Sequence, residues 1–284
     1  MSLLAKEALR LTTSRLQEAG IESAGLDARI LLEHILGVSR EELLFSLDLT
    51  LTTAQYTRLE NLVEERKKRS PIAKLIGKRE FWGLDFTVSA ATLDPRPDSE
   101  TLIEEILERV QDRAFALKIL DLGTGTGCLL FSLLSEFPAA KGVAVDVSAE
   151  ALEIARQNAA SLGLVERVDF IHSKWAENIH GEKFDIIVSN PPYIPSAEIA
   201  ELAPEVAVFE PKLALDGGVD GLDCYRTIIK QLPNLLAENG FAAFEIGIGQ
   251  EKDIEKIAGE NGLKLVTAKK DLGGIIRCLI LQKI

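Results

Sequence analysis

Apolar side chains recur at three- and four-residue spacing through the first quarter of the chain, which is the pattern of amphipathic helices. The repeat is visible over residues 3–11, 28–36 and 51–68, where leucine, alanine and isoleucine fall on one helical face. We therefore predict a small all-helical domain over residues 1–70.

The pattern changes over residues 71–97 into short extended segments. The stretch FWGLDFTV combines aromatic and β-branched residues, and Gly77, Gly83, Pro95 and Pro97 interrupt the segment around it. Turn residues between short apolar runs favour a hairpin. We predict a hairpin-like connector here.

From residue 98 to residue 284, short apolar runs alternate with helical stretches. The predicted strands are 118–122, 142–147, 168–172 and 184–189, followed by 241–246, 263–268 and 275–281. This alternation is typical of a parallel sheet with crossover helices, and the last two runs are close enough in sequence to pair antiparallel. The predicted fold class is α/β.

Composition indicates a globular protein without a membrane anchor. Hydrophobic residues make up 46% of the chain and charged residues 27%, which is enough apolar material for a packed core. No apolar run approaches the roughly 20 residues that a membrane-spanning helix needs. We therefore expect a cytoplasmic location.

The cysteines and histidines do not suggest a metal site. Cys128, Cys224 and Cys278 are far apart and form no C-x-x-C pair, and the three histidines lack spacing such as H-E-x-x-H. We expect no metal and reduced thiols.

Net charge argues against broad binding to a nucleic acid. The formal charge is -12, and residues 91–284 carry 31 acidic against 19 basic side chains, whereas residues 1–90 carry 13 of each. Binding along a phosphate backbone requires many lysines and arginines. One basic run, Arg66 to Arg69, could meet an acidic partner, but a solvated helix end is the favoured interpretation.

Glycines follow the first strand of the α/β domain in the stretch KILDLGTGTGCLL. Gly123, Gly125 and Gly127 permit a tight turn, and the helix after them starts with N–H groups that can face a ligand. Asp146 ends the next strand about 20 residues later, where a carboxylate can accept hydrogen bonds from both ribose hydroxyls. This combination favours a nucleoside cofactor over a plain turn. Trp175 either covers an adenine ring or packs as an ordinary tryptophan.

The stretch FDIIVSNPPYIP places four chemically suggestive residues at the end of the fourth strand. Asn190 offers a side-chain oxygen and Pro191 a carbonyl, so together they can accept both hydrogens of a planar NH₂ group. Pro192 makes the segment rigid, and Tyr193 can pack on the planar group. A simple strand terminator is the alternative, since proline cannot continue a ladder. We favour a site for an amide or amino nitrogen that becomes methylated.

These residues resemble the class I methyltransferases that act on glutamine or adenine nitrogens, through DLGTGTG and NPPY. Further stretches narrow the resemblance: DARILLEHILG, SPIAKLIGKREFWGLDFTV, LDPRPDSETLIEEIL, FEPKLALDGGVDGLDCYR and FEIGIGQ. Together they are similar to the peptide chain release factor glutamine methyltransferases, the PrmC or HemK family. The resemblance covers nearly the whole chain.

The resemblance implies a Rossmann-like, seven-stranded and mostly parallel sheet, and S-adenosyl-L-methionine as methyl donor. It also implies that the helical domain helps to hold the release factor, whose GGQ loop presents the glutamine. Separately, we expect a monomeric enzyme. The donor would be bound by Gly123, Thr124, Gly125, Thr126, Gly127, Asp146, Trp175 and Asn190. The glutamine amide would be held by Asn190, Pro191, Pro192 and Tyr193.

Two other functions stay open at this point. An adenine amino methyltransferase would use the same two acceptors on a flipped base, although the acidic catalytic domain offers little surface for a phosphate backbone. A cofactor-binding protein without activity would retain the fold, but it would have no need of paired acceptors at residues 190 and 191.

Overall fold

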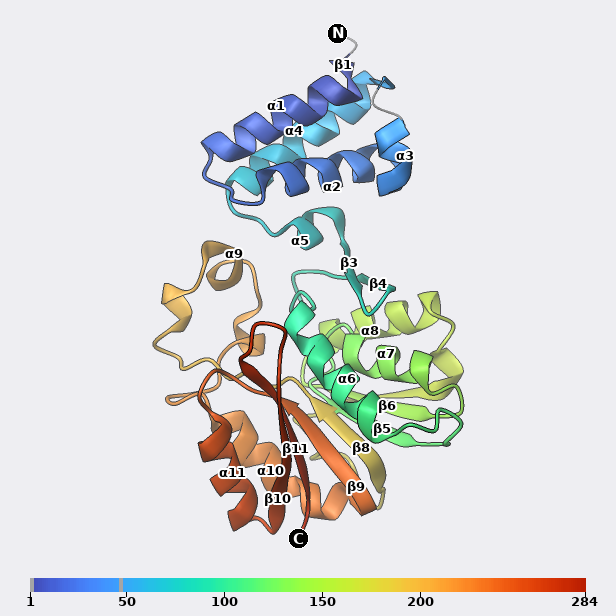
Figure 1. Ribbon diagram of the computed structural model, residues 1–284, viewed down its shortest axis with the longest axis vertical. Coiled ribbons are helices and arrows are strands. Elements are labelled where there is room, and N and C mark those ends of the chain that lie inside the picture. The colour runs from blue at the N-terminus through green and yellow to red at the C-terminus, as the bar shows by residue number, and fades with distance from the viewer. Residues whose placement is uncertain (1–2, 46–47) are drawn as a thin grey trace. The chain divides into compact units, whose positions relative to one another are not determined.

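The computed structural model describes residues 3–45 and 48–284, which divide into two compact units (Figure 1). One unit contains the residues up to Gly77 together with the segment Pro204–Phe209. The other contains Lys78–Ala203 and Glu210–Ile284. We call them the helical unit and the catalytic unit. The functional division expected at residues 70 and 97 stays a prediction.

The helical unit is built as its apolar spacing predicts, around one core. Ala8 of α1, Leu31 of α2 and Val63 of α4 are fully buried or nearly so in this core. A feature that was not predicted is a two-residue antiparallel pairing of β1 with β2. The elements of the unit are β1 (Leu3–Leu4), α1 (Ala5–Glu18), α2 (Ala24–Leu36), α3 (Arg40–Phe45), β2 (Thr50–Leu51), α4 (Thr53–Lys67), α5 (Ile72–Ile76) and α9 (Pro204–Ala207).

Arg66 contradicts the interpretation of the basic run as a solvated helix end. Its side chain is only 6% exposed and its Nε donates to Asp27 Oδ2 at 2.8 Å, while Asp27 itself is 4% exposed. A second guanidinium nitrogen donates to Glu205 at 3.1 Å within the same unit. Lys68 does remain at the surface. The run therefore mixes a buried ion-pair residue with solvated ones.

We expect Arg66→Met to destabilise the helical unit by about 3–5 kcal/mol, because removing one partner leaves a buried charge without compensation. Native-state hydrogen exchange of the α2 and α4 amides would measure this loss. Lys68→Ala is the matched control, since its exposed pair with Glu65 contributes little. Equal protection in Arg66→Met and the unsubstituted protein would contradict the expectation.

The catalytic unit contains a seven-stranded sheet of order β10-β11-β9-β8-β5-β6-β7, which confirms the predicted α/β class. Strands β9, β8, β5, β6 and β7 pair in parallel, whereas β11 is antiparallel to both its neighbours. The strands are β5 (Lys118–Leu122), β6 (Lys141–Asp146), β7 (Val168–His172), β8 (Phe184–Ser189), β9 (Leu236–Glu245), β10 (Leu263–Lys270) and β11 (Ile276–Lys283).

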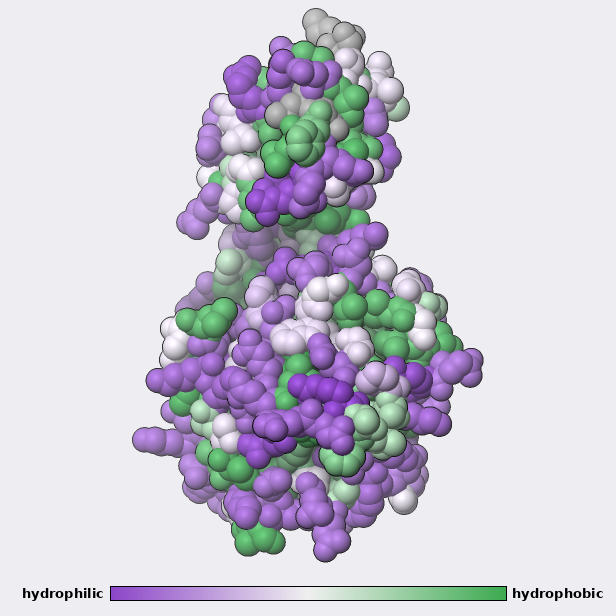
Figure 2. Space-filling view, turned by 45° about the vertical axis from the view of Figure 1, so that its right-hand side comes forward, coloured by the Kyte–Doolittle hydropathy of each residue, from purple (hydrophilic) through white to green (hydrophobic). Residues whose placement is uncertain are grey.

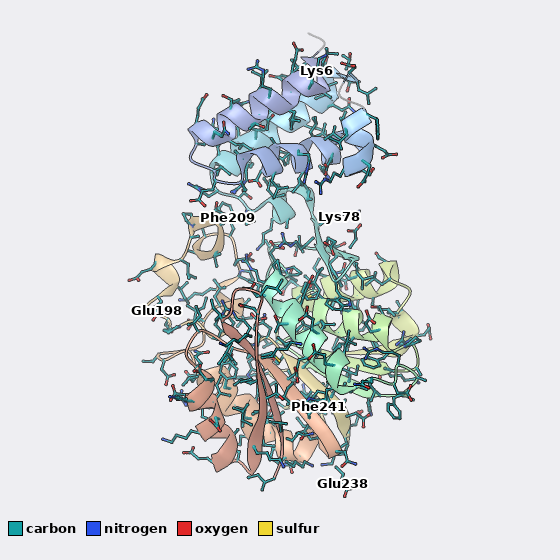
Figure 3. The ribbon with its side chains drawn as sticks, in the orientation of Figure 1. Lys6, Lys78, Glu198, Phe209, Glu238 and Phe241 are labelled. Carbon is teal, nitrogen blue, oxygen red and sulfur yellow. The ribbon has the colours of Figure 1, made fainter. Side chains whose placement is uncertain are left out.

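Helices cover both faces of this sheet (Figure 1). One core holds side chains of α6, α7 and α8, and the other holds side chains of α10 and α11. Phe241 on β9 (labelled in Figure 3) belongs to the first core. The guanidinium of Arg109 lies 5.6 Å from its ring centroid. The helices are α6 (Glu100–Arg109), α7 (Cys128–Glu136), α8 (Ala149–Ser161), α10 (Asp223–Leu235) and α11 (Glu251–Glu260), with single 3₁₀ turns at Pro97–Ser99, Val165–Arg167, Ile199–Glu201 and Lys212–Ala214.

The predicted hairpin is present as β3 (Lys78–Phe81) and β4 (Leu84–Thr87). Its two turn residues, Trp82 and Gly83, both have positive φ, as a tight two-residue hairpin loop requires. Phe81 and Phe86 anchor the hairpin in the core of the catalytic unit.

The surface is mostly hydrophilic on the face shown in Figure 2. Apolar residues there occur in separate patches. Across the part of the chain that the structure describes, no helix is both long and apolar enough to cross a bilayer.

The order of strands determines where a ligand can bind. The chain runs from β5 outward to β6 and β7, then returns to place β8 on the other side of β5. Ligands of open α/β sheets bind beyond the carboxyl ends of the strands at such a switch point. The glycine turn follows β5 and the NPPY segment follows β8, so both motifs meet there.

Candidate active site

A cavity of about 500 Å³ lies at this switch point and is lined by residues of the catalytic unit alone. Its volume is within the usual range for small-molecule sites, about 300–1,000 Å³. The glycine turn, Asp146 and Trp175 line one part of the cavity, while Asn190 and Pro192 line another. Most residues that were predicted to bind donor and substrate therefore share one cavity, whereas Gly127, Pro191 and Tyr193 are not among the residues that line it.

The glycine turn forms a tight loop between β5 and α7. Gly123, Gly125 and Gly127 have φ values of 77°, 55° and 82°, a region that other residues rarely adopt. The amides of Gly123 and Thr124 both donate to the carbonyl of Val145, at 2.8 and 2.9 Å. These two amides therefore hold the turn onto β6, and the expectation that the N–H groups at the start of α7 face a ligand stays a prediction.

The two threonines of the turn are almost fully buried, at 5% exposure for Thr124 and 2% for Thr126. Thr124 donates its hydroxyl to Asp121 at 2.7 Å, and the carbonyl of Thr126 accepts from the Asn158 side chain at 2.9 Å. Both threonines therefore brace the turn from within while also lining the cavity.

Asp146 lies at the end of β6 and accepts two backbone hydrogen bonds. Its Oδ2 accepts from the amide of Gly125 and its Oδ1 from the amide of Ser148, both at 2.9 Å. Burial raises the pKa of Asp146, and these two hydrogen bonds lower it. Each carboxylate oxygen has a further lone pair, so the side chain can hold the turn and still accept from a ribose hydroxyl.

Trp175 lines the cavity and is packed against the core on the α10 and α11 side of the sheet. Its φ of 52° is unusual for a residue with a side chain. The ring lies against Gly123, where an added Cβ would come within 3.3 Å of it. The Trp175 ring both packs against the core and lines the cavity, so these observations do not choose between an ordinary packed tryptophan and one that covers an adenine ring.

The NPPY segment leaves β8 at Ser189, whose hydroxyl donates to the carbonyl of Leu122 at 2.6 Å. This bond ties the end of β8 to the end of β5. Asn190 Nδ2 donates to Ser99 Oγ at 3.2 Å, and no residue in the described ranges donates to Asn190 Oδ1. Pro191 is buried and Pro192 half-buried. The asparagine oxygen is thus available to a ligand in the cavity.

Tyr193 donates its hydroxyl to Glu245 at 3.3 Å, and its ring packs against the core. Burial raises the pKa of Tyr193, and the negative charge of Glu245 raises it further. The phenol therefore stays neutral and cannot serve as a base at physiological pH. Beyond it the chain continues through an exposed loop that includes Glu198 (Figure 3).

Known proteins resemble this chain over nearly its whole length. Residues 7–77 match the family model of the PrmC N-terminal domain, and residues 87–208 match that of the methyltransferase small domain. A release factor glutamine methyltransferase of Rhodospirillum rubrum is 45% identical over 269 residues, covering 95% of this chain and 82% of that protein. That of Bradyrhizobium diazoefficiens is 44% identical, covering 98% and 94%.

The chain belongs to the release factor glutamine methyltransferase family. A methyltransferase from Pyrococcus furiosus has the same fold, with a TM-score of 0.53 at 18% identity over 81% of this chain and 98% of that one.

In this family member, residues outside the two predicted motifs also build the site. Gln250 donates from its amide to the carbonyl of Tyr193 at 3.0 Å and accepts from the amide of Gly247 at 2.9 Å. Gly221 has a φ of 76°, and an added Cβ would lie 2.3 Å from the Tyr193 carbonyl oxygen. The stretches FEIGIGQ and DGGVDG contain these residues, but nothing in their pattern shows that they hold the NPPY segment.

Asp121 is a buried carboxyl with a raised pKa close to the cavity. It lies one contact behind the cavity wall, since Thr124 donates to it. Burial raises the pKa of Asp121 to about 7, the Thr124 hydrogen bond lowers it, and the nearby Asp146 charge raises it. A cation in the cavity would favour the ionised form of both carboxyls.

We expect binding of the cationic donor to release protons near pH 7, because Asp121, whose pKa burial raises to about 7, is partly protonated before binding. Donor affinity should accordingly rise between pH 6 and pH 8. Calorimetric titrations in phosphate and in Tris would show the release as an enthalpy that depends on the buffer. In the Asp121→Asn variant the binding enthalpy should not depend on the buffer. A binding enthalpy that still depends on the buffer in this variant would assign the released proton to another group.

Proposed function

We propose that this protein transfers the methyl group of S-adenosyl-L-methionine to the side-chain amide nitrogen of the glutamine in the GGQ loop of peptide chain release factors. Family membership supports the substrate class, because relatives that are 44–45% identical over almost the whole chain carry that name. The cavity at the switch point supports the use of a nucleoside donor.

One observation carries this proposal. Asn190 Oδ1 accepts no hydrogen bond from the residues that the structure describes, and Asn190 lies in the cavity wall. The Pro191 carbonyl follows it directly in the chain. A primary amide has two N–H donors in one plane, which is the complement of two adjacent acceptors.

The proposed reaction depends mainly on how the substrate amide nitrogen is positioned. An amide nitrogen is a weak nucleophile because its lone pair is delocalised into the carbonyl, and acceptors on both N–H groups restore electron density to it. Asn190 and Pro191 would supply these acceptors, while Tyr193 would pack on the amide plane. Positioning of this kind can contribute roughly 7–11 kcal/mol to lowering a barrier.

A strong base is unnecessary in this mechanism. The nitrogen becomes acidic only once it carries the methyl group and a positive charge, and its proton then leaves to solvent. The neutral Tyr193 phenol is consistent with a mechanism that needs no strong base, since burial raises its pKa.

The donor would bring an electrophilic methyl group on a sulfonium. The site fits such a molecule, because Asp146 retains free lone pairs at the end of β6 and two carboxyls, Asp121 and Asp146, give the cavity a negative field. Asp146 would hold the ribose, the glycine turn would admit the ligand backbone closely, and Trp175 would cover the adenine.

Other parts of the proposal concern partners and location. The helical unit would help to hold the release factor, with shape and local patches more important than net charge, since residues 1–90 carry equal numbers of acidic and basic side chains. The monomeric state and cytoplasmic location expected from the sequence stay predictions.

A methyl-transfer assay with labelled donor tests the proposal. Purified protein is offered intact release factor, the same factor with its GGQ glutamine replaced by alanine, and adenine-rich duplex DNA. We expect label on the intact factor alone. Label on DNA alone would replace the proposal with adenine methylation at the same two acceptors, and label on the alanine variant would place the methyl group elsewhere on the factor.

A further inference from the structure

Asn190 is connected to a buried carboxylate through one serine. Its Nδ2 donates to Ser99 Oγ at 3.2 Å, and Ser99 in turn donates its hydroxyl hydrogen to Glu245 Oε2. Ser99 is 3% exposed and Glu245 2% exposed. The three residues come from the turn before α6, the end of β8 and the end of β9, so the chain of hydrogen bonds exists only in the folded catalytic unit.

The direction of these hydrogen bonds is determined by Glu245. Its second oxygen, Oε1, accepts from the Tyr193 hydroxyl at 3.3 Å, so both carboxylate oxygens accept hydrogen bonds. Burial raises the pKa of Glu245, whereas the Ser99 hydrogen bond and the Arg277 charge lower it. Because both oxygens of Glu245 accept, from the Tyr193 and Ser99 hydroxyls, Ser99 uses its single hydrogen on Glu245.

This arrangement leaves only one favourable orientation for the Asn190 amide. With its hydrogen committed, Ser99 Oγ can only accept, so it requires the NH₂ end of Asn190. A flipped amide would place Oδ1 against an oxygen that has no hydrogen to offer.

We propose that Ser99 and Glu245 are positioning residues that orient the Asn190 amide, so that Oδ1 faces the substrate nitrogen as an acceptor. This inference rests on the proposed amide methylation. Glu245 also accepts from the Tyr193 hydroxyl. One buried carboxyl group therefore orients both the Asn190 amide and the Tyr193 ring, which are the two groups proposed to contact the substrate amide. Neither Ser99 nor Glu245 needs to touch the transferred methyl group.

Steady-state kinetics of four variants of the full chain test the proposal. Ser99→Ala removes the link, and Ser99→Thr retains a hydroxyl. Glu245→Met removes the final acceptor at similar volume, and it is combined with Ser99→Ala in a double variant. Ser132→Ala is the matched control, because Ser132 is also fully buried but lies on α7 with no partner among the described side chains for its hydroxyl.

We expect Ser99→Ala to lower kcat on the order of 10- to 100-fold, the loss typical of a misplaced reacting group. Donor dissociation constants measured by calorimetry should stay unchanged, and Ser99→Thr should recover most of the turnover. The double variant should be no slower than Glu245→Met alone, because both substitutions break one connected chain. The melting temperatures of all variants identify any general loss of folding.

Three results would overturn the positioning role. The first is a kcat of Ser99→Ala within about twofold of that of the unsubstituted enzyme. The second is a Ser99→Thr variant as slow as Ser99→Ala. The third is donor binding that weakens in Ser99→Ala in parallel with its kcat. An unsubstituted enzyme that labels no release factor would instead overturn the proposed function, so the two failures can be told apart.

Discussion

Asn190→Ala should lower methyl transfer severely while leaving donor affinity nearly intact. The Asn190 side chain supplies one of only two acceptors proposed for the substrate amide, and its Oδ1 makes no hydrogen bond within the described part of the chain. Loss of one such positioned group costs about 10²- to 10³-fold in turnover. Single-turnover kinetics with labelled donor would measure the chemical step, and calorimetry would measure the donor dissociation constant.

The matched control for this substitution is Asn234→Ala, at an exposed position near the end of α10. It should be as active as the unsubstituted enzyme. If Asn190→Ala weakens donor binding by the same factor as it lowers turnover, Asn190 contacts the donor and not the substrate amide.

The second large effect is expected at Asp146. Asp146→Ala should weaken donor binding at least tenfold, because hydrogen bonds to a charged group contribute about 1.5–3 kcal/mol each and the side chain also holds the Gly125 amide. The rate at saturating donor should fall much less. Titration calorimetry across donor concentration gives the dissociation constant directly.

Asp146→Asn separates the two contributions, since it retains an oxygen for a backbone amide and removes the charge. We expect it to bind donor more tightly than Asp146→Ala and less tightly than the unsubstituted enzyme. An unchanged dissociation constant in both variants would rule out a ribose contact.

The sheet and the place of the site could be predicted because their signals are local. Buried parallel strands appear as continuous apolar runs, and the motifs after β5 and β8 lie beside the strands that position them. Because carboxyl ends of parallel strands share one edge of a sheet, Asp146 and Asn190 were expected together, and both line the cavity.

The supports of the site could not be predicted because their partners are distant in sequence. Ser99 is 91 residues from Asn190 and 146 residues from Glu245. A serine after a proline-rich turn and a glutamate at the end of a strand have no pattern that relates them. The interpretation of the basic run as a solvated helix end was wrong at Arg66, which is buried. A run of charged residues has the same sequence pattern whether or not one of them is buried.

The discontinuous helical unit has a consequence for synthesis on the ribosome. Arg66 pairs with Glu205, which follows 139 residues later in the chain. At a translation rate of about 5–20 residues per second, roughly 7–28 s separate the two residues. During that interval β5 to β8 emerge, and Arg66 has Asp27 as its carboxylate partner. The helical unit therefore acquires its ion pairs of Arg66 and Arg69 with Glu205 only after four of the seven strands of the catalytic sheet have been made.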